Sequence, residues 1–200
     1  MKSIFVLSLS LFLLTSFKPE GGYKVGDQAI DFKLKNVDDK MVSLADFKTA
    51  KGFIVVFTCN HCPFSKKYED RIIALDKKYK SLGYPVIAIN PNDASQHAID
   101  DFDGMKKRAK EKGFTFPYLH DETQYTATAY GAKMTPHVFI LQKQNTANVV
   151  KYIGAIDDNS DNEKEVKEKY VESAVDNLLA GKEVNPVFTK AIGCTIKWKK

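Results

Sequence analysis

Two cysteines separated by two residues, Cys59-Asn-His-Cys62, are the residues of this 200-residue chain that most clearly could do chemistry. They follow the apolar run 53–57, which predicts a buried strand, and precede a stretch with apolar residues at helical spacing. Cys59 is predicted to open this helix, and because a helix N-terminus stabilises an anion, we expect it to be an exposed, acidic nucleophile. Cys62 is expected to be more buried and to resolve the mixed disulfide.

The residues around the two cysteines refine this interpretation. His61 is expected to stabilise the Cys59 thiolate, which would make the disulfide a stronger oxidant. Pro63 is tolerated in the first helical turn, and it excludes a haem attachment motif, which needs histidine after the second cysteine. An inert disulfide is the structural alternative, but a bridge across two residues adds little stability. The motif therefore favours thiol–disulfide exchange.

The remaining pattern predicts an α/β fold with a central sheet. Strands are predicted by short apolar runs at 53–57, 85–90, 138–141 and 149–153. Helices are predicted between Phe64 and Leu82, within 96–112 and over 163–179, with the acidic stretch 157–161 as a solvated cap. The tail 190–200 is predicted to be extended.

The N-terminus predicts a targeting segment. Residues 1–18 have one lysine before fifteen uncharged residues, typical of a signal peptide or an uncleaved anchor. Residues 19–200 are then one domain, with a C-terminal helix and tail in 157–200. We expect an exported, periplasmic or other extracytoplasmic location, where disulfides persist, and membrane contact only through an uncleaved N-terminus.

Composition excludes several classes of partner. With 30 basic and 25 acidic residues, the charge gives no argument for binding nucleic acid. Three cysteines are too few for a disulfide scaffold or a cysteine-only zinc site. We predict neither a cofactor nor a metal.

A second element, Met134-Thr-Pro-His-Val138, places a proline at the start of a strand. With it, the chain resembles the thioredoxin-fold superfamily and, more narrowly, the AhpC/TSA (redoxin) and exported thioredoxin-like group. The resemblance covers roughly residues 25–156 and is carried by the segments 25–32, 51–63, 116–123 and 130–141. It implies a thioredoxin-like fold, whose central mixed sheet is flanked by helices on both faces. It also implies a cis peptide at Thr135–Pro136 beside Cys59, with the Thr135 backbone pairing an extended substrate segment.

Departures from the family pattern rank the possible activities. Thr58 stands where thioredoxins usually have tryptophan, and Phe53 replaces their buried acid. The stretch 54–58 lacks the proline that peroxiredoxins place before their reactive cysteine. Direct peroxide reduction therefore ranks below disulfide exchange.

The leading hypothesis is a thiol–disulfide oxidoreductase that acts on disulfides or thiols of exported proteins, with a thiol–disulfide electron donor or acceptor as partner. One alternative is a peroxiredoxin-like antioxidant thiol peroxidase, in which Cys62 or Cys194 resolves a Cys59 sulfenic acid. Another is a copper-handling protein that uses both thiolates and a histidine such as His137. Cys194 is expected to be buried in a packed tail or to be a third redox cysteine that exchanges with Cys59.

Overall fold

The computed structural model describes residues 21–200, so the predicted targeting segment 1–18 lies outside the described residues. The strands are β1 (Gln28–Ala29), β2 (Lys33–Asn36), β3 (Met41–Ser43), β4 (Gly52–Phe57), β5 (Val86–Asn90), β6 (Tyr118–His120), β7 (Met134–Thr135), β8 (His137–Gln144), β9 (Ala147–Gly154) and β10 (Cys194–Thr195). The α-helices are α1 (Pro63–Tyr79), α2 (Phe102–Lys112), α3 (Tyr125–Tyr130) and α4 (Tyr170–Leu179). Short 3₁₀ helices cover Leu44–Asp46, Lys80–Leu82, Ala98–Asp100 and Glu163–Glu165.

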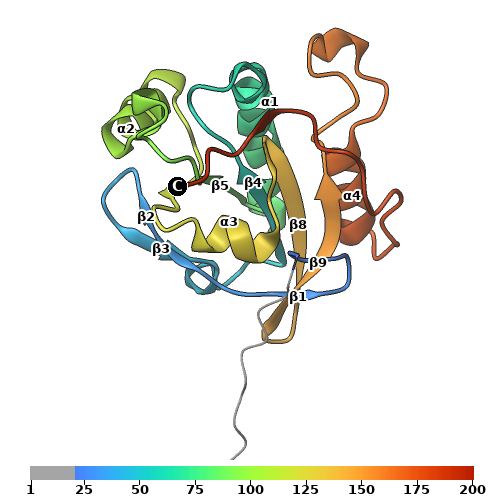
Figure 1. Cartoon of the computed structure of the whole chain (residues 1–200). Helices are drawn as coiled ribbons and strands as arrows, with labels where there is room; N and C mark the ends of the chain where they lie inside the picture. Colours follow the sequence, from blue (N-terminus) through green and yellow to red (C-terminus); the bar gives the residue numbers. More distant parts are fainter. Residues whose placement is uncertain (1–20) are drawn as a thin grey trace, which may run out of the picture.

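One mixed sheet organises the molecule, and helices cover both of its faces (Figure 1). Its strand order is β1-β9-β8-β4-β5-β6-β2-β3. β5 is parallel to β4 and β6, whereas β8 is antiparallel to β4 and β9. The predicted thioredoxin-like α/β architecture is confirmed.

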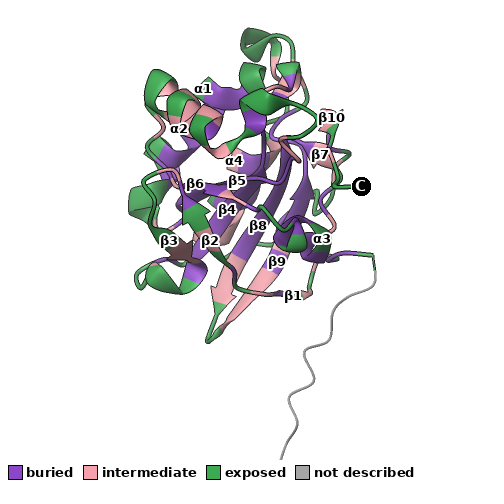
Figure 2. Ribbon diagram, turned by 60° about the vertical axis from the view of Figure 1, so that its left-hand side comes forward, coloured by how far each residue is buried: buried purple, intermediate pink, exposed green. Residues whose placement is uncertain are grey.

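The central strand β4 is buried along its whole length, as Figure 2 shows by its purple colour. Because strand side chains alternate, Phe53, Val55 and Phe57 pack in one apolar cluster with residues of α3. Ile54 and Val56 pack in a second cluster with residues of α1, α2 and α4. The two cores fix β4 from both sides, so the loop that starts after Phe57 leaves from a rigid support.

Helix α1 begins at Pro63, with Cys62 as its N-cap residue. Proline is favoured at the first helical position because its missing N–H has no intrahelical partner there. Cys59 therefore precedes the helix, and the prediction that it opens the helix is wrong. The predicted apolar stripe is confirmed in Tyr68, Ile72, Leu75 and Tyr79, which are all buried.

The helix predicted within 96–112 is confirmed as α2, whereas the helix predicted over 163–179 is shorter in the structure. Residues 98–100 form a 3₁₀ turn, and α2 starts only after Asp101, whose carboxylate accepts the Gly104 N–H at 2.6 Å. Further on, the Asp158 N–H bonds to the Glu168 carbonyl, which closes residues 158–168 into a loop. The predicted helix 163–179 is consequently a 3₁₀ turn at Glu163–Glu165 followed by α4.

The C-terminal residues are extended, as predicted, and run back past the start of α1 to the region around α2 and α3 (Figure 1). Strand β10 pairs antiparallel with β7, and Cys194 lies opposite Thr135. No helix within residues 21–200 combines the length and apolarity needed to cross a membrane.

Candidate functional site

Thr135 is the residue where the cysteine loop, helix α1 and the C-terminal tail meet. Its hydroxyl Oγ1 lies 3.2 Å from the Cys59 Sγ, and its carbonyl oxygen lies 3.2 Å from the Cys62 Sγ. The peptide bond between Thr135 and Pro136 is cis, as the family resemblance implied. The expected position of the Thr135–Pro136 turn beside Cys59 is confirmed, and Cys62 contacts the same residue.

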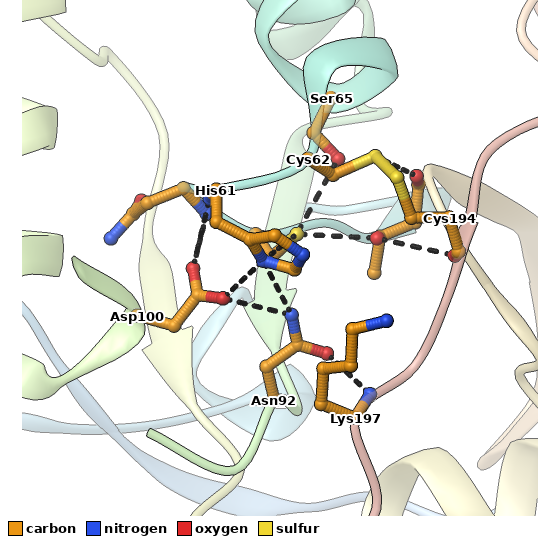
Figure 3. The surroundings of a disulfide bond; sticks show 10 residues. His61, Cys62, Ser65, Asn92, Asp100, Cys194 and Lys197 are labelled. Atoms are coloured by element: carbon orange, nitrogen blue, oxygen red, sulfur yellow. Dashed lines mark hydrogen bonds and ion pairs between the residues drawn. A yellow bond between two sulfur atoms is a disulfide. The ribbon is translucent and has the colours of Figure 1, made fainter. Parts of the chain in front are cut away.

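The disulfide joins Cys62 to Cys194, with a Cα–Cα distance of 6.0 Å, and Cys59 is a free thiol (Figure 3). The tail therefore folds back over the motif, and its cysteine is bonded to Cys62, whereas the redox role considered for Cys194 was exchange with Cys59. The geometry of Thr135 explains the difference. Cys194 pairs with the Thr135 backbone, whose carbonyl contacts Cys62, whereas Cys59 contacts the Thr135 side chain.

The Cys59 thiol is neither exposed nor acidic in this state. Only 2% of the residue is accessible, and burial, followed by the negative charge of Asp100, raises the pKa of its thiol. The Thr135 hydroxyl, the Cys62 N–H and the Ser65 hydroxyl oppose this shift of the pKa. The predicted exposed thiolate is thus wrong, because burial and the charge of Asp100 outweigh the hydrogen bonds that favour the thiolate. Cys62 is 0% exposed, so the prediction that it is more buried than Cys59 is confirmed.

Asp100, which sequence reasoning missed, holds the cysteine loop from its other side. Its Oδ1 accepts the N–H groups of Asn60 and His61 at 2.6 and 3.2 Å. Its Oδ2 accepts from the Asn92 amide at 2.9 Å and lies 2.6 Å from His61 Nδ1 (Figure 3). Since a carboxylate only accepts, Nδ1 carries the proton of that hydrogen bond. The fully buried carboxylate therefore fixes both the backbone and the imidazole of the loop.

The side chain of His61 is held between Asp100 and Cys59. Its Nδ1 lies 3.6 Å from the Cys59 Sγ, and its ring stacks on His97 with centroids 4.0 Å apart. The expected place of His61 beside the Cys59 sulfur is confirmed, and His97 packs against its ring.

Asn92 could have been found from the sequence, whereas Asp100 could not. Asn92 lies two residues after β5, whose carboxyl end adjoins that of the parallel strand β4. Functional groups gather at such ends in open α/β sheets. Asp100 lies in a 3₁₀ turn with no pattern of its own, and only the tertiary structure brings it to Cys59.

The remaining predicted residues, Thr58 and Pro63, bound the loop. The Thr58 N–H donates to the Ile89 carbonyl at 2.8 Å, which extends the pairing of β4 with β5 by one residue. Pro63 starts α1. Both residues place the cysteines through the backbone.

Among residues 21–200, one group of side chains could supply ligands to a metal ion. Donor atoms of Cys59, His61 and Asp100 lie within 4.8 Å of one another. Both Asp100 oxygens already take part in two hydrogen bonds each, so the hydrogen-bond network accounts for the grouping. His137, the copper ligand considered above, is outside this group: its Nδ1 accepts the Lys133 N–H, and burial lowers its pKa to about 4.

The tail is held on this site largely through its backbone. The Lys197 N–H donates to the Asn92 Oδ1 at 2.9 Å (Figure 3), and its carbonyl accepts from the Asp93 N–H and the Gln124 amide, each at 2.8 Å. Ile196 is 3% exposed and packs in the apolar cluster beneath. Asn92 thus links the tail directly to the Asp100 network.

A Cys-x-x-Cys loop after the central strand, faced by a cis-proline turn, defines a thioredoxin-like protein. Residues 25–153 match the model of the AhpC/TSA family, and the chain belongs to this family.

Three relatives show which other proteins the chain resembles. It is 24% identical over 123 residues to the thiol-disulfide oxidoreductase ResA of Halalkalibacterium halodurans, a match to 60% of this chain and 64% of that protein, which is less than two thirds of its length. A conserved protein of Geobacillus kaustophilus, described as uncharacterized, is 39% identical with a TM-score of 0.81, covering 92% of this chain and 94% of that one. A hypothetical protein of Sinorhizobium meliloti 1021 is 34% identical with a TM-score of 0.82, covering 89% and 96%.

Proposed function

We propose that the protein is a thiol–disulfide oxidoreductase in which Cys59 is the nucleophile and Cys62 the resolving cysteine. The observation that carries this proposal is the meeting of a free thiol, Cys59, and a disulfide sulfur, Cys62, at the same residue, Thr135. The similarity to ResA proteins, which bear the name of this activity, supports it.

The chemistry balances as two successive exchanges. In the reduced protein the Cys59 thiolate attacks one sulfur of a substrate disulfide, and the other sulfur leaves as a thiolate. Cys62 then attacks Cys59 in the mixed disulfide, so the substrate is released as a dithiol and the Cys59–Cys62 pair is oxidised. The reverse sequence oxidises a dithiol substrate. Thr135 and Ser65 place two hydroxyl groups near the Cys59 sulfur, and these stabilise the thiolate when it forms.

We assign the substrates to exported proteins and the electron partner to another thiol–disulfide protein. The targeting segment predicted at 1–18 supports an extracytoplasmic location, either as a cleaved signal or as an anchor. An oxidising compartment is also where a Cys62–Cys194 disulfide would persist.

Trapping of the mixed disulfide tests the proposal. The double variant Cys62→Ser/Cys194→Ser keeps Cys59 as its sole cysteine, so a substrate attacked by Cys59 cannot be released. The matched variant Cys59→Ser/Cys194→Ser keeps Cys62 instead. Incubation with a model protein disulfide should give a covalent adduct, cleaved by dithiothreitol, only with the Cys59 protein. Equal adducts with both variants, or none with either, would contradict the proposal.

Peroxide reduction ranks below exchange because the stretch 54–58 lacks the proline that peroxiredoxins place before their reactive cysteine. Stopped-flow oxidation of reduced protein by hydrogen peroxide separates the two activities: we expect the rate of an ordinary buried thiol.

A further inference from the structure

The segment Gly193–Ile196 lies where the substrate of such an enzyme is expected to bind. Its strand pairs with Met134–Thr135, the residues that precede the cis-proline, and its cysteine is bonded to Cys62. The Ile196 N–H continues the pairing by donating to the Lys133 carbonyl at 3.1 Å. An extended backbone on one strand edge, with a cysteine at the motif, is the arrangement that a bound substrate would adopt.

The contacts of this segment define what the edge accepts. At Gly193, an added Cβ would lie 2.3 Å from the Thr135 carbonyl oxygen, so only glycine fits without a backbone shift. Cys194 is opposite Thr135. Thr195 is exposed, so its side chain is not selected, while the Ile196 side chain is buried in an apolar cluster. The edge accepts the pattern glycine, cysteine, any residue, aliphatic residue.

We propose that residues 193–196 are an internal substrate, and that the enzyme acts on extended Gly-Cys-x-aliphatic segments of other proteins once this segment has left Thr135. The inference rests on the proposed function and adds both the substrate class and a redox role for Cys194.

A single exchange releases the segment. The Cys59 thiolate attacks the Cys62 sulfur, a Cys59–Cys62 bond forms, the Cys62–Cys194 bond breaks, and Cys194 leaves as a thiolate that takes up a proton. The number of disulfides is unchanged, so no outside oxidant or reductant is needed. β10 is then held only by noncovalent contacts.

The Thr135 hydroxyl couples this release to Cys59. It lies 3.5 Å from the Cys194 carbonyl, to which it donates, and 3.2 Å from the Cys59 Sγ. Once the thiol–disulfide electron partner has reduced the Cys59–Cys62 disulfide, with the segment away from Thr135, the hydroxyl proton is free to turn to the Cys59 thiolate, so absence of the internal substrate activates the nucleophile for the next one.

Two peptides test the substrate class on the unmodified protein. One has the sequence of residues 191–197, Ala-Ile-Gly-Cys-Thr-Ile-Lys, and the other has alanine in place of its glycine; each carries thionitrobenzoate on its cysteine. Reduced protein should release thionitrobenzoate from the glycine peptide roughly tenfold faster, because overpacking the edge costs ~1–3 kcal/mol. Equal rates with the two peptides would overturn the inference.

A tail variant tests the displacement. Gly193→Ala pushes the internal segment from Thr135, so the reduced variant should react with the glycine peptide several-fold faster than wild type. The control Ile192→Ala changes a neighbouring residue that is 45% exposed and should leave the rate unchanged. No acceleration in Gly193→Ala would overturn the inference even where the two peptides differ.

The small disulfide 5,5′-dithiobis(2-nitrobenzoate) separates the two proposals. If reduced protein exchanges with it at Cys59 but does not distinguish the peptides, the internal-substrate inference fails and the proposed function stands. If reduced protein exchanges with none of these disulfides, the proposed function fails and the inference with it.

Discussion

The cysteine loop is held on its two sides by different kinds of bond. On the α2 side, a fully buried carboxylate, Asp100, engages two N–H groups, an imidazole and an amide. On the tail side, the contacts are two short paired strands, a few main-chain hydrogen bonds and one reducible covalent bond. The Asp100 network contains no bond that thiol–disulfide exchange can break. The disulfide on the tail side can be broken while the sheet core stays packed. The comparison indicates a fixed support on one side and a releasable segment on the other.

The largest expected effect is the loss of the covalent bond on the tail side. Cys62 and Cys194 are 132 residues apart, and closing a loop of that size is expected to stabilise the fold by about 5 kcal/mol. Urea denaturation of oxidised and reduced protein should show this difference in the free energy of unfolding. In Cys194→Ser, oxidised and reduced protein should unfold together, since a Cys59–Cys62 bridge closes only a small loop. If oxidised and reduced wild-type protein unfolded at the same urea concentration, the stabilisation by the disulfide would be refuted.

The next effect is on the α2 side. Asp100→Asn keeps the shape of the side chain but places an amide group against two of its four donors, which should cost about 3 kcal/mol of unfolding free energy. The control Asp103→Asn alters an exposed carboxylate on α2 and should change stability little. Because Asp100 positions His61, its variant should also slow the reaction of Cys59 with a small disulfide. Equal unfolding free energies of Asp100→Asn and Asp103→Asn would show that Asp100 does not support the cysteine loop.

A smaller effect is the pH dependence of stability that His137 causes at the start of β8. Burial lowers the pKa of His137 to about 4 from an ordinary 6.5, so the unfolded chain binds this proton first as pH falls. The stability from His137 is therefore full above pH 6.5 and is lost towards pH 4, by about 2 kcal/mol at pH 5. His137→Asn should flatten the fall in urea midpoint between pH 7 and 5, whereas exposed His97→Asn should retain it. An unchanged slope in His137→Asn would contradict the assignment.

The smallest effect concerns the noncovalent hold on the tail. Gln124→Ala removes hydrogen bonds to the Lys197 carbonyl and from the Lys199 N–H. With about 1 kcal/mol lost locally, the Ile196 and Lys197 amides of reduced protein should exchange hydrogen roughly fivefold faster. Gln96→Ala, which removes one exposed contact to Trp198, should have less effect on those amides. If both variants exchange as wild type does, Gln124 does not hold the tail.

Patterns of neighbouring residues were enough to predict much of the fold that surrounds the site. The apolar run 53–57 is the buried central strand, the stripe from Tyr68 to Tyr79 is one face of α1, and the cis peptide at Thr135–Pro136 follows the family resemblance. These features depend on neighbouring residues or on a shared motif, so they can be predicted from a single sequence.

The errors in the exposure and pairing of the cysteines have one physical origin: each concerns a contact between distant segments. The burial of Cys59 depends on Thr135, and the raised pKa of its thiol depends on burial and on Asp100. The bond between Cys62 and Cys194 follows from the pairing of β10 with β7, which no local spacing encodes. Cys194 also lies beyond residues 25–153, the part that matches the family model.

Disulfide mapping of the oxidised protein tests the central claim most directly. Acid quenching, alkylation of free thiols and tryptic digestion leave both motif cysteines in the peptide 52–66 and Cys194 in the peptide 191–197. The account predicts that these two peptides are joined, with fragment ions that place the alkyl group on Cys59 and the cross-link on Cys62. A peptide 52–66 closed on itself by a Cys59–Cys62 bond, with Cys194 alkylated in every molecule, would contradict it.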